Sequence, residues 1–154
     1  MNTDTTWHLN TASSEETEAL GVSIGARLRG GEVIELRSDL GGGKTTLVRG
    51  IAHGANSQDA VGSPSFTISR EYKTPSFVIH HYDFYRLSEP GIMADELHDV
   101  MSDPQAVVLV EWADVAEHVL PAERVIIKIA ASGDDSREIE ISLPQKYAYL
   151  KEEN

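Results

Sequence analysis

The sequence contains no cysteine, no long apolar run and few positive charges, and each of these absences excludes a class of protein. Without cysteine there is no disulfide, no thiol nucleophile and no Cys-ligated zinc or iron–sulfur centre, which is compatible with a reducing compartment. No apolar run approaches the roughly 20 residues of a membrane-spanning helix, and residues 1–14 lack the apolar stretch of a signal peptide. We therefore expect a cytoplasmic protein that does not interact with membranes.

The shortage of positive charge bears on possible partners. The 154 residues include 13 Lys and Arg against 25 Asp and Glu, which gives a formal net charge of −12 at pH 7. Binding to the phosphates of a nucleic acid or of an anionic membrane needs clustered cations. We therefore expect no unaided binding of nucleic acid by this chain.

The spacing of apolar residues predicts alternating helices and strands in one domain over residues 1–154, with flexible ends at 1–6 and 151–154. The expected helices are one capped by Ser13 or Ser14 and ended by Gly30, and three more at 44–54, 90–101 and 113–119. The expected strands are 6–9, 32–36 and 106–110, and the expected β-hairpins are 66–85 and 124–143. The run 106–110 is the most apolar in the chain, which is typical of a strand buried on both faces. This order predicts an α/β fold with a mixed, partly antiparallel central sheet flanked by helices.

A glycine-rich segment between a predicted strand and a predicted helix is the most informative motif. It reads Ser38-Asp39-Leu40-Gly41-Gly42-Gly43-Lys44-Thr45-Thr46. Glycines let backbone N–H groups turn toward a triphosphate, and a helix N-terminus attracts the anion. Lys44 would neutralise the β- and γ-phosphates, and the Thr45 hydroxyl would bind Mg²⁺. We predict a P-loop nucleotide site, with Ser38 in the place where the strict pattern has glycine; the alternative is a turn followed by a solvated lysine.

An acidic residue ends the most apolar strand. Glu111 follows the run 106–110, as the carboxylate of a Walker B strand does, and ligands of α/β sheets bind at the carboxyl ends of strands. Alone, this pattern is more often a core strand followed by a solvated acid. Beside a phosphate loop, it makes Glu111 the candidate acidic contact to Mg²⁺. The guanine-specific sequence Asn-Lys-x-Asp does not occur, so ATP is the expected nucleotide.

Two further motifs complete a family resemblance. They are Ser-Pro-Ser-Phe-Thr-Ile at 63–68 and His-Tyr-Asp-Phe-Tyr-Arg-Leu at 81–87. Together with the phosphate loop and Val-Glu-Trp-Ala-Asp at 110–114, they make the chain resemble the TsaE family (formerly YjeE) over about residues 7–130. This family consists of small bacterial P-loop ATPases of tRNA threonylcarbamoyladenosine biosynthesis. Its pattern usually has Gly at the position of Ser38, and often Thr at that of Ser65 and Ala at that of Gly42.

The resemblance implies a reaction and a protein partner. TsaE proteins act with the TsaB–TsaD pair, which transfers a threonylcarbamoyl group to the adenosine next to the anticodon. It implies a weak, partner-dependent Mg²⁺-ATPase whose hydrolysis resets that complex, with tRNA contacted only through the complex. Ser38 favours an alternative, a nucleotide-sensing module that holds ATP without turnover. A small-molecule kinase is disfavoured, because only Arg70 and Arg86 follow the loop where an arginine-rich lid is expected.

His81 and Asp83 are the candidate catalytic residues. At positions i and i+2 of a strand they face the same side, where a carboxylate beside an imidazole could orient a water molecule or accept its proton. The alternative is a surface His–Asp pair. The hydroxyl of Ser65 could reach the γ-phosphate, unless 63–67 is only a loop entering a strand. The candidate nucleotide ligands are Asp39, Leu40, Gly41, Gly42, Gly43, Lys44, Thr45, Thr46 and Ser65.

Overall fold

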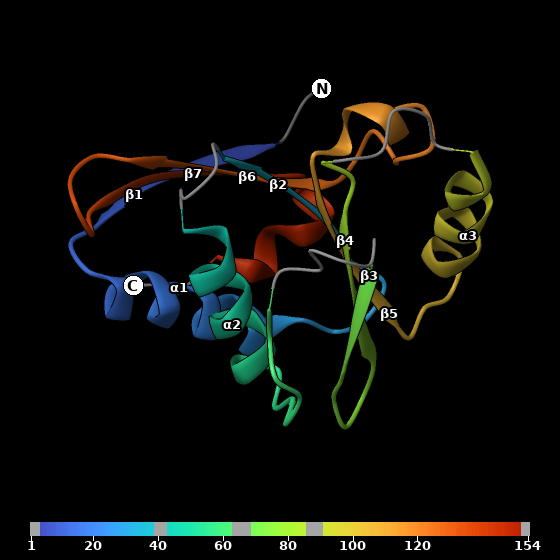
Figure 1. Cartoon of the computed structure of the whole chain (residues 1–154), viewed down its shortest axis with the longest axis horizontal. Helices are drawn as coiled ribbons and strands as arrows, with labels where there is room; N and C mark the ends of the chain where they lie inside the picture. Colours follow the sequence, from blue (N-terminus) through green and yellow to red (C-terminus); the bar gives the residue numbers. More distant parts are fainter. Residues whose placement is uncertain (1–3, 39–42, 63–68, 86–90, 152–154) are drawn as a thin grey trace.

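The protein folds around a mixed β-sheet whose strands follow the order β1-β7-β6-β2-β5-β4-β3 within the part of the chain that the structure describes (Figure 1). This computed structural model describes residues 4–38, 43–62, 69–85 and 91–151. The elements are β1 (Thr5–Thr11), α1 (Ser14–Arg27), β2 (Val33–Ser38), α2 (Lys44–Gly54), β3 (Ser69–Lys73), β4 (Val78–Asp83), α3 (Gly91–Met101), β5 (Ala106–Glu111), the 3-10 segment η1 (Ala113–Ala116), β6 (Val125–Ala131), β7 (Arg137–Leu143) and the 3-10 segment η2 (Gln145–Leu150).

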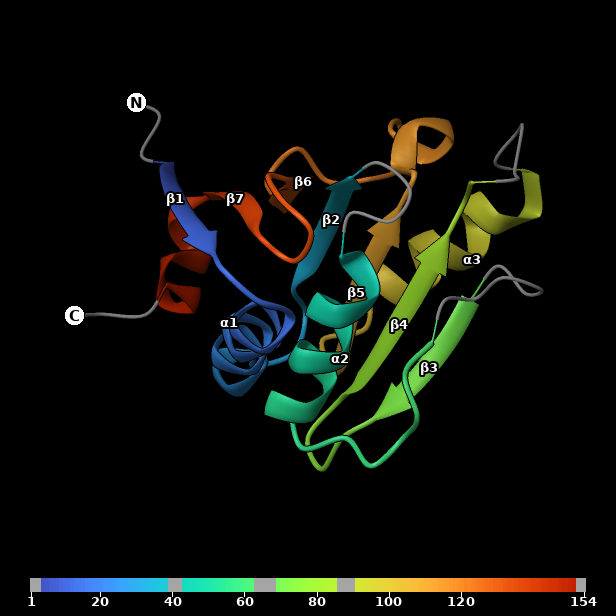
Figure 2. The ribbon, with the colours of Figure 1, turned by 60° about the vertical axis from the view of Figure 1, so that its left-hand side comes forward.

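Parallel pairing at the centre and antiparallel pairing at the edges make the sheet mixed. β2 runs parallel to both β5 and β6, and β4 runs parallel to β5. The two hairpins and β1 add the antiparallel pairs β3–β4, β6–β7 and β1–β7. Figure 2 shows the arrows of β2, β5 and β4 pointing the same way, so their carboxyl ends lie along one edge. The predicted mixed, partly antiparallel sheet is confirmed.

Helices cover both faces of the central strands. One core packs α1 and α2 against Val107 and Leu109 of β5, and the other packs Leu97 of α3 against Val108 and Val110. Figure 1 shows α2 and α3 on opposite sides of β4 and β5. All six residues of β5 are buried, as expected for a central strand. Because side chains alternate along a strand, the last residue of β5 faces the same side as Leu109, which is the side of α2.

Glycines allow α1 and α2 to pack with their backbones in close contact. A Cβ atom on Gly50 of α2 would lie 2.1 Å from the carbonyl oxygen of Glu18, and one on Gly25 of α1 would lie 2.0 Å from that of Ile51. Neither position can therefore hold a larger residue without separating the helices. This packing fixes α2 against α1 and so fixes the position of its N-terminus above the sheet.

The structure differs from the predicted elements in several places. Thr5 and Thr6, within the end 1–6 that was predicted to be flexible, begin β1 and pair with β7. The expected helix 113–119 is only the short segment η1, and it follows Trp112, whose φ of 55° turns the chain sharply after β5. The segment η2, which the sequence pattern did not indicate, buries Tyr147 and Leu150 in the core beside α1.

Among the described residues, none of the helices combines the length and the apolar character that a bilayer crossing requires.

Candidate functional site

The N-terminus of α2 has no side-chain cap among the described residues. Gly43, which precedes the helix, has a φ of 99° and no side chain that could cap it. By contrast, α1 begins with a Ser13 side chain that accepts a hydrogen bond from Glu16, and it carries acidic residues in its first turn. The first turn of α2 has no acidic residue. Its N–H groups and its positive dipole end therefore favour an external anion.

Lys44 begins α2 and points toward the carboxyl end of β5. Its Nζ atom lies 3.3 Å from Oε1 of Glu111 and 4.8 Å from the centre of the Trp112 ring. The lysine is buried, so its charge is balanced by these two groups rather than by water. The two residues that sequence analysis predicted to hold phosphate and metal therefore form a direct ion pair.

Glu111 contacts two side chains among the described residues, Lys44 and His81. While Oε1 faces Lys44, Oε2 forms a short hydrogen bond with Nε2 of His81. Burial by itself would raise the pKa of Glu111, but the hydrogen bond and charge of His81 and the charge of Lys44 outweigh burial and hold this pKa below its ordinary value. The carboxylate is therefore ionised at neutral pH, as a ligand for a divalent cation must be.

His81 contacts a different carboxylate from the one that sequence analysis predicted. It shares a face of β4 with Asp83, but its carboxylate partner is Glu111 of the neighbouring strand. In the register Leu109 lies opposite His81, and Glu111 lies diagonal to His81 on the same face of the sheet, a separation that long side chains can bridge. Asp83 is half-buried at the end of β4, opposite Glu111 in the register, and its Oδ1 atom accepts a hydrogen bond from the Tyr85 amide at 2.9 Å.

Two aromatic rings border the site. The Tyr85 and Trp112 rings lie 4.9 Å apart at their centres, and Tyr85 is 52% exposed. The positive φ of Trp112 is unusual for a bulky side chain and stores backbone strain, which is typical of functional sites. This conformation places the indole ring against Lys44.

The predicted nucleotide ligands are only partly described. Gly43, Lys44, Thr45 and Thr46 lie at the start of α2, with both threonines half-buried. The remaining predicted ligands lie outside the described residues; they are Asp39, Leu40, Gly41, Gly42 and Ser65.

The sequence motifs did not indicate Tyr72 and Arg137, which lie near the predicted site residues His81 and Gly43. The Tyr72 hydroxyl lies 2.9 Å from Nδ1 of His81. The expected hairpin could have indicated Tyr72. Pairing of Tyr72 with Ile79 places both residues on the same face of the sheet as His81. Arg137 begins β7, and its Nε atom lies 3.2 Å from where a Cβ on Gly43 would be.

The oxygen donors at this site fit Mg²⁺. The carboxylate of Glu111 and the hydroxyl of Thr45 are hard ligands, which Mg²⁺ prefers. Within residues 4–38, 43–62, 69–85 and 91–151 there is no group of three or more His, Asp and Glu side chains arranged to hold a metal ion.

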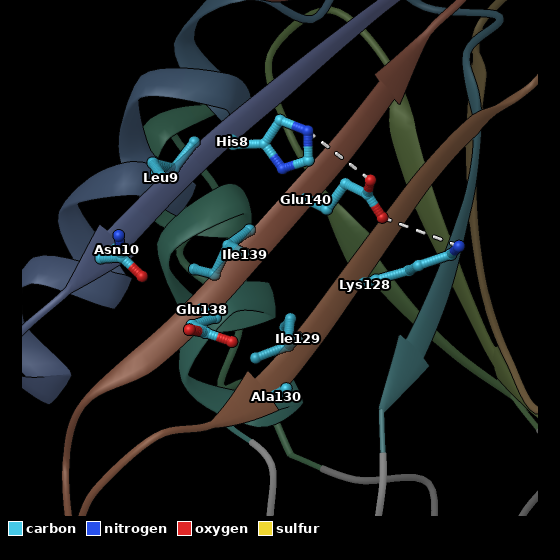
Figure 3. Close-up of a pocket in the computed structure, with 9 residues that line it drawn as sticks. All are labelled: His8, Leu9, Asn10, Lys128, Ile129, Ala130, Glu138, Ile139 and Glu140. Carbon is cyan, nitrogen blue, oxygen red and sulfur yellow. Dashed lines mark ion pairs between the residues drawn. The ribbon is translucent and has the colours of Figure 1, made fainter.

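A hollow lies on another part of the sheet, away from Lys44 and Glu111. It is on β1, β7 and β6, and Figure 3 shows His8, Glu140 and Lys128 lying across it in a row. Oε1 of Glu140 is 3.8 Å from Nε2 of His8, and Oε2 is 3.7 Å from Nζ of Lys128. None of the residues that line it is a predicted site residue.

Comparison with known proteins identifies the family of this chain. The family model described as threonylcarbamoyl adenosine biosynthesis protein TsaE matches residues 11–139. The chain belongs to the TsaE family. The TsaE protein of Bacillus subtilis is 40% identical over 148 residues, which cover 93% of this chain and 90% of that protein. The TsaE protein of Haemophilus influenzae is 34% identical over 71% of this chain and 68% of that protein.

A solved structure has the same fold. The crystal structure of Bacillus subtilis YdiB superposes with a TM-score of 0.79 at 34% sequence identity, covering 97% of this chain and 94% of that one. The resemblance to the TsaE family, which the sequence motifs indicated, is therefore confirmed by relatives that span most of the chain.

Proposed function

We propose that this protein binds and hydrolyses Mg²⁺–ATP as a subunit of the machinery that makes N6-threonylcarbamoyladenosine in tRNA. In this proposal it acts in the cytoplasm with a TsaB–TsaD complex, and hydrolysis resets that complex between turnovers. Membership of a family named for threonylcarbamoyl adenosine biosynthesis supports the pathway. The observation that carries the ATP site is the contact between Lys44 and Glu111 at the N-terminus of α2, which has no side-chain cap among the described residues.

The Lys44–Glu111 ion pair supports binding of a charged pair of ligands. Both side chains are buried, and each holds a charge that the other balances. An incoming phosphate would attract Lys44, and a divalent cation would attract Glu111. Bound Mg²⁺–ATP would therefore give each of the two residues a new partner of opposite charge. Thr45 would hold the cation together with Glu111. When bound, Mg²⁺ would neutralise charge on the β- and γ-phosphates.

His81 and Asp83 take different roles in this proposal. His81 is buried against Glu111 and holds that carboxylate in place. Asp83 is half-buried at the end of the neighbouring strand, so its carboxylate is accessible beside the site. Asp83 would orient the attacking water or accept its proton, which typically contributes about 10²–10⁴-fold to a rate.

The charge of the chain supports a protein partner. With a net charge of −12, the chain is poorly suited to holding tRNA directly. It would therefore contact tRNA only through the TsaB–TsaD complex. Exposed Tyr85 and its neighbour Trp112 lie at the edge of the site, where a partner protein could contact them.

Calorimetric titration of ATP into wild type, Lys44→Ala and Lys146→Ala tests the binding step. Lys146 is an exposed matched control, since its Nζ atom also lies near an aromatic ring, 5.0 Å from the centre of Tyr147. We expect Lys44→Ala to lose measurable ATP binding and Lys146→Ala to keep it. Equal affinity in wild type and Lys44→Ala would overturn the assignment of the nucleotide site.

Single-turnover hydrolysis with and without TsaB–TsaD tests the reaction. We expect slow hydrolysis by the isolated chain and faster hydrolysis in the complex. ATP binding without hydrolysis, even with both partners present, would instead support the nucleotide-sensing module. Reconstituted tRNA modification with and without this chain then tests the pathway: repeated turnover that does not depend on the chain would refute the resetting role.

A further inference from the structure

We propose that Tyr72 is a positioning residue of the nucleotide site, because its hydroxyl holds His81 and thereby the Glu111 carboxylate. This inference rests on the proposed function, since it gives Tyr72 a role in metal-dependent nucleotide binding. Neither the sequence motifs nor the predicted site residues include Tyr72.

The contacts of Tyr72 place its hydroxyl between two polar groups. Its side chain is buried on β3, with a relative exposure of 1%. The hydroxyl donates a hydrogen bond to the Gly62 carbonyl at 3.1 Å and lies 2.9 Å from Nδ1 of His81. The rings of Tyr72 and His81 are tilted by 47° with their centres 5.8 Å apart. The contact between these residues is therefore made by the hydroxyl.

Hydrogen bonds on both sides fix the orientation of the His81 ring. A tyrosine hydroxyl has one hydrogen and an oxygen that accepts, so Tyr72 can contact both the Gly62 carbonyl and Nδ1 of His81. Whether the hydroxyl or Nδ1 donates depends on the histidine tautomer. In either case Nδ1 faces Tyr72, and the imidazole presents Nε2 to Glu111. Tyr72 therefore fixes the rotation of the ring.

A continuous chain of polar contacts results. It runs from the Gly62 carbonyl through Tyr72, His81 and Glu111 to Lys44. Some residues orient a metal ligand by hydrogen bonding without contacting the metal. Replacing such a residue typically lowers metal affinity or activity 10–100-fold. Because Glu111 is the proposed carboxylate ligand, the loss of the Tyr72 hydroxyl is expected to act on metal-dependent steps first.

Tyr72→Phe removes only the hydroxyl, and Tyr82→Phe is its matched control. Tyr82 is equally buried, lies on the opposite face of β4 and packs against Phe84 with ring centres 5.7 Å apart. Its hydroxyl makes no hydrogen bond to the residues that the structure describes. The measurements are ATP affinity with and without Mg²⁺, the Mg²⁺ dependence of single-turnover hydrolysis in the TsaB–TsaD complex, and stability to urea.

We expect Tyr72→Phe to raise the Mg²⁺ concentration at half-saturation about 10-fold or more. ATP affinity without Mg²⁺ should stay within about twofold of wild type, because Lys44 remains in place. Tyr82→Phe should change neither quantity. NMR of ¹⁵N-labelled histidine gives a reading that needs no ligand: the Nδ1 resonance of His81 should shift in Tyr72→Phe and not in Tyr82→Phe.

The outcomes separate this inference from the proposed function. Absence of Mg²⁺-dependent ATP binding in wild type would refute the proposed function, and the role given to Tyr72 with it. Normal binding in wild type with an unchanged Mg²⁺ dependence in Tyr72→Phe would overturn the inference alone. Equal losses of affinity with and without Mg²⁺, in step with lower stability, would show that Tyr72 is only structural. An unshifted Nδ1 resonance in Tyr72→Phe would likewise contradict the proposed contact.

Discussion

Replacing Glu111 by glutamine keeps the shape of a buried side chain and removes the charge that balances Lys44. Glutamine has an oxygen at only one of the two positions, so its NH2 group, which is a donor, replaces the oxygen that faces either Lys44 or Nε2 of His81. We therefore expect Glu111→Gln to lower the stability of the ligand-free protein. This expectation depends only on the observed contacts, and not on the bound nucleotide.

The size of the effect follows from the geometry. Two unit charges 3.3 Å apart attract each other by about 5 kcal/mol at an effective dielectric constant of about 20. Desolvation offsets much of this attraction, but removal of one partner leaves the other charge buried without compensation, which typically costs about 3–5 kcal/mol. Lys44 keeps the Trp112 ring as a neighbour. We therefore expect the lower end of that range, about 3 kcal/mol of unfolding free energy.

Urea unfolding followed by far-UV circular dichroism measures this loss, with Asp83→Asn as the matched control. Asp83 lies opposite Glu111 in the register, and asparagine keeps the carbonyl oxygen that accepts the Tyr85 amide. Asp83→Asn should therefore cost less than about 1 kcal/mol. Lys44→Met and the double variant complete a cycle, in which we expect a coupling energy of about 1–3 kcal/mol.

Two results would refute this reasoning. The first is a loss of unfolding free energy in Asp83→Asn as large as that in Glu111→Gln. It would mean that burial of the Lys44–Glu111 ion pair does not determine how much stability is lost. The second is a coupling energy within about 0.5 kcal/mol of zero, the level expected of independent sites. The second result would mean that Lys44 and Glu111 do not form the ion pair in solution.

Further predictions concern the reaction, the partner and acid stability. Thr45→Ala should weaken Mg²⁺–ATP binding more than metal-free ATP binding in calorimetry; equal weakening would remove Thr45 from the metal site. Asp83→Asn should keep nucleotide binding and slow partner-stimulated single-turnover hydrolysis by about 10²–10⁴-fold, and wild-type rates would leave Asp83 structural. The isolated chain should bind tRNA only weakly in salt titrations, so tight, salt-sensitive binding would contradict the partner role. Burial would raise the pKa of Glu35, but its hydrogen bonds and charge interactions with Arg37 and Arg124 outweigh burial and lower this pKa below 4.5. The resulting stability is present above that pH and is lost as the pH falls through the lowered pKa, so urea unfolding should show a smaller loss in acid for Glu35→Gln than for wild type.

Much of the fold could be predicted from local patterns in the sequence. Both hairpins, the buried strand at 106–110 and the helix that begins at Lys44 appear in the structure close to their predicted bounds. Each depends on neighbours in the chain: alternation, an apolar run, or glycine before a helix. The segment η2 was missed because its burial depends on packing against α1, which is distant in sequence.

Sequence alone determined the kinds of groups at the site and the strand or helix that carries each one. Lys44 at a helix start and Glu111 at a strand end follow from the chain around them. Only the tertiary structure decided which groups touch, because such contacts depend on strand order and register. The register places Glu111 of β5 and Tyr72 of β3 diagonal to His81 on the same face of the sheet, within reach of long and aromatic side chains. His81 therefore contacts Glu111 on one neighbouring strand and Tyr72 on the other.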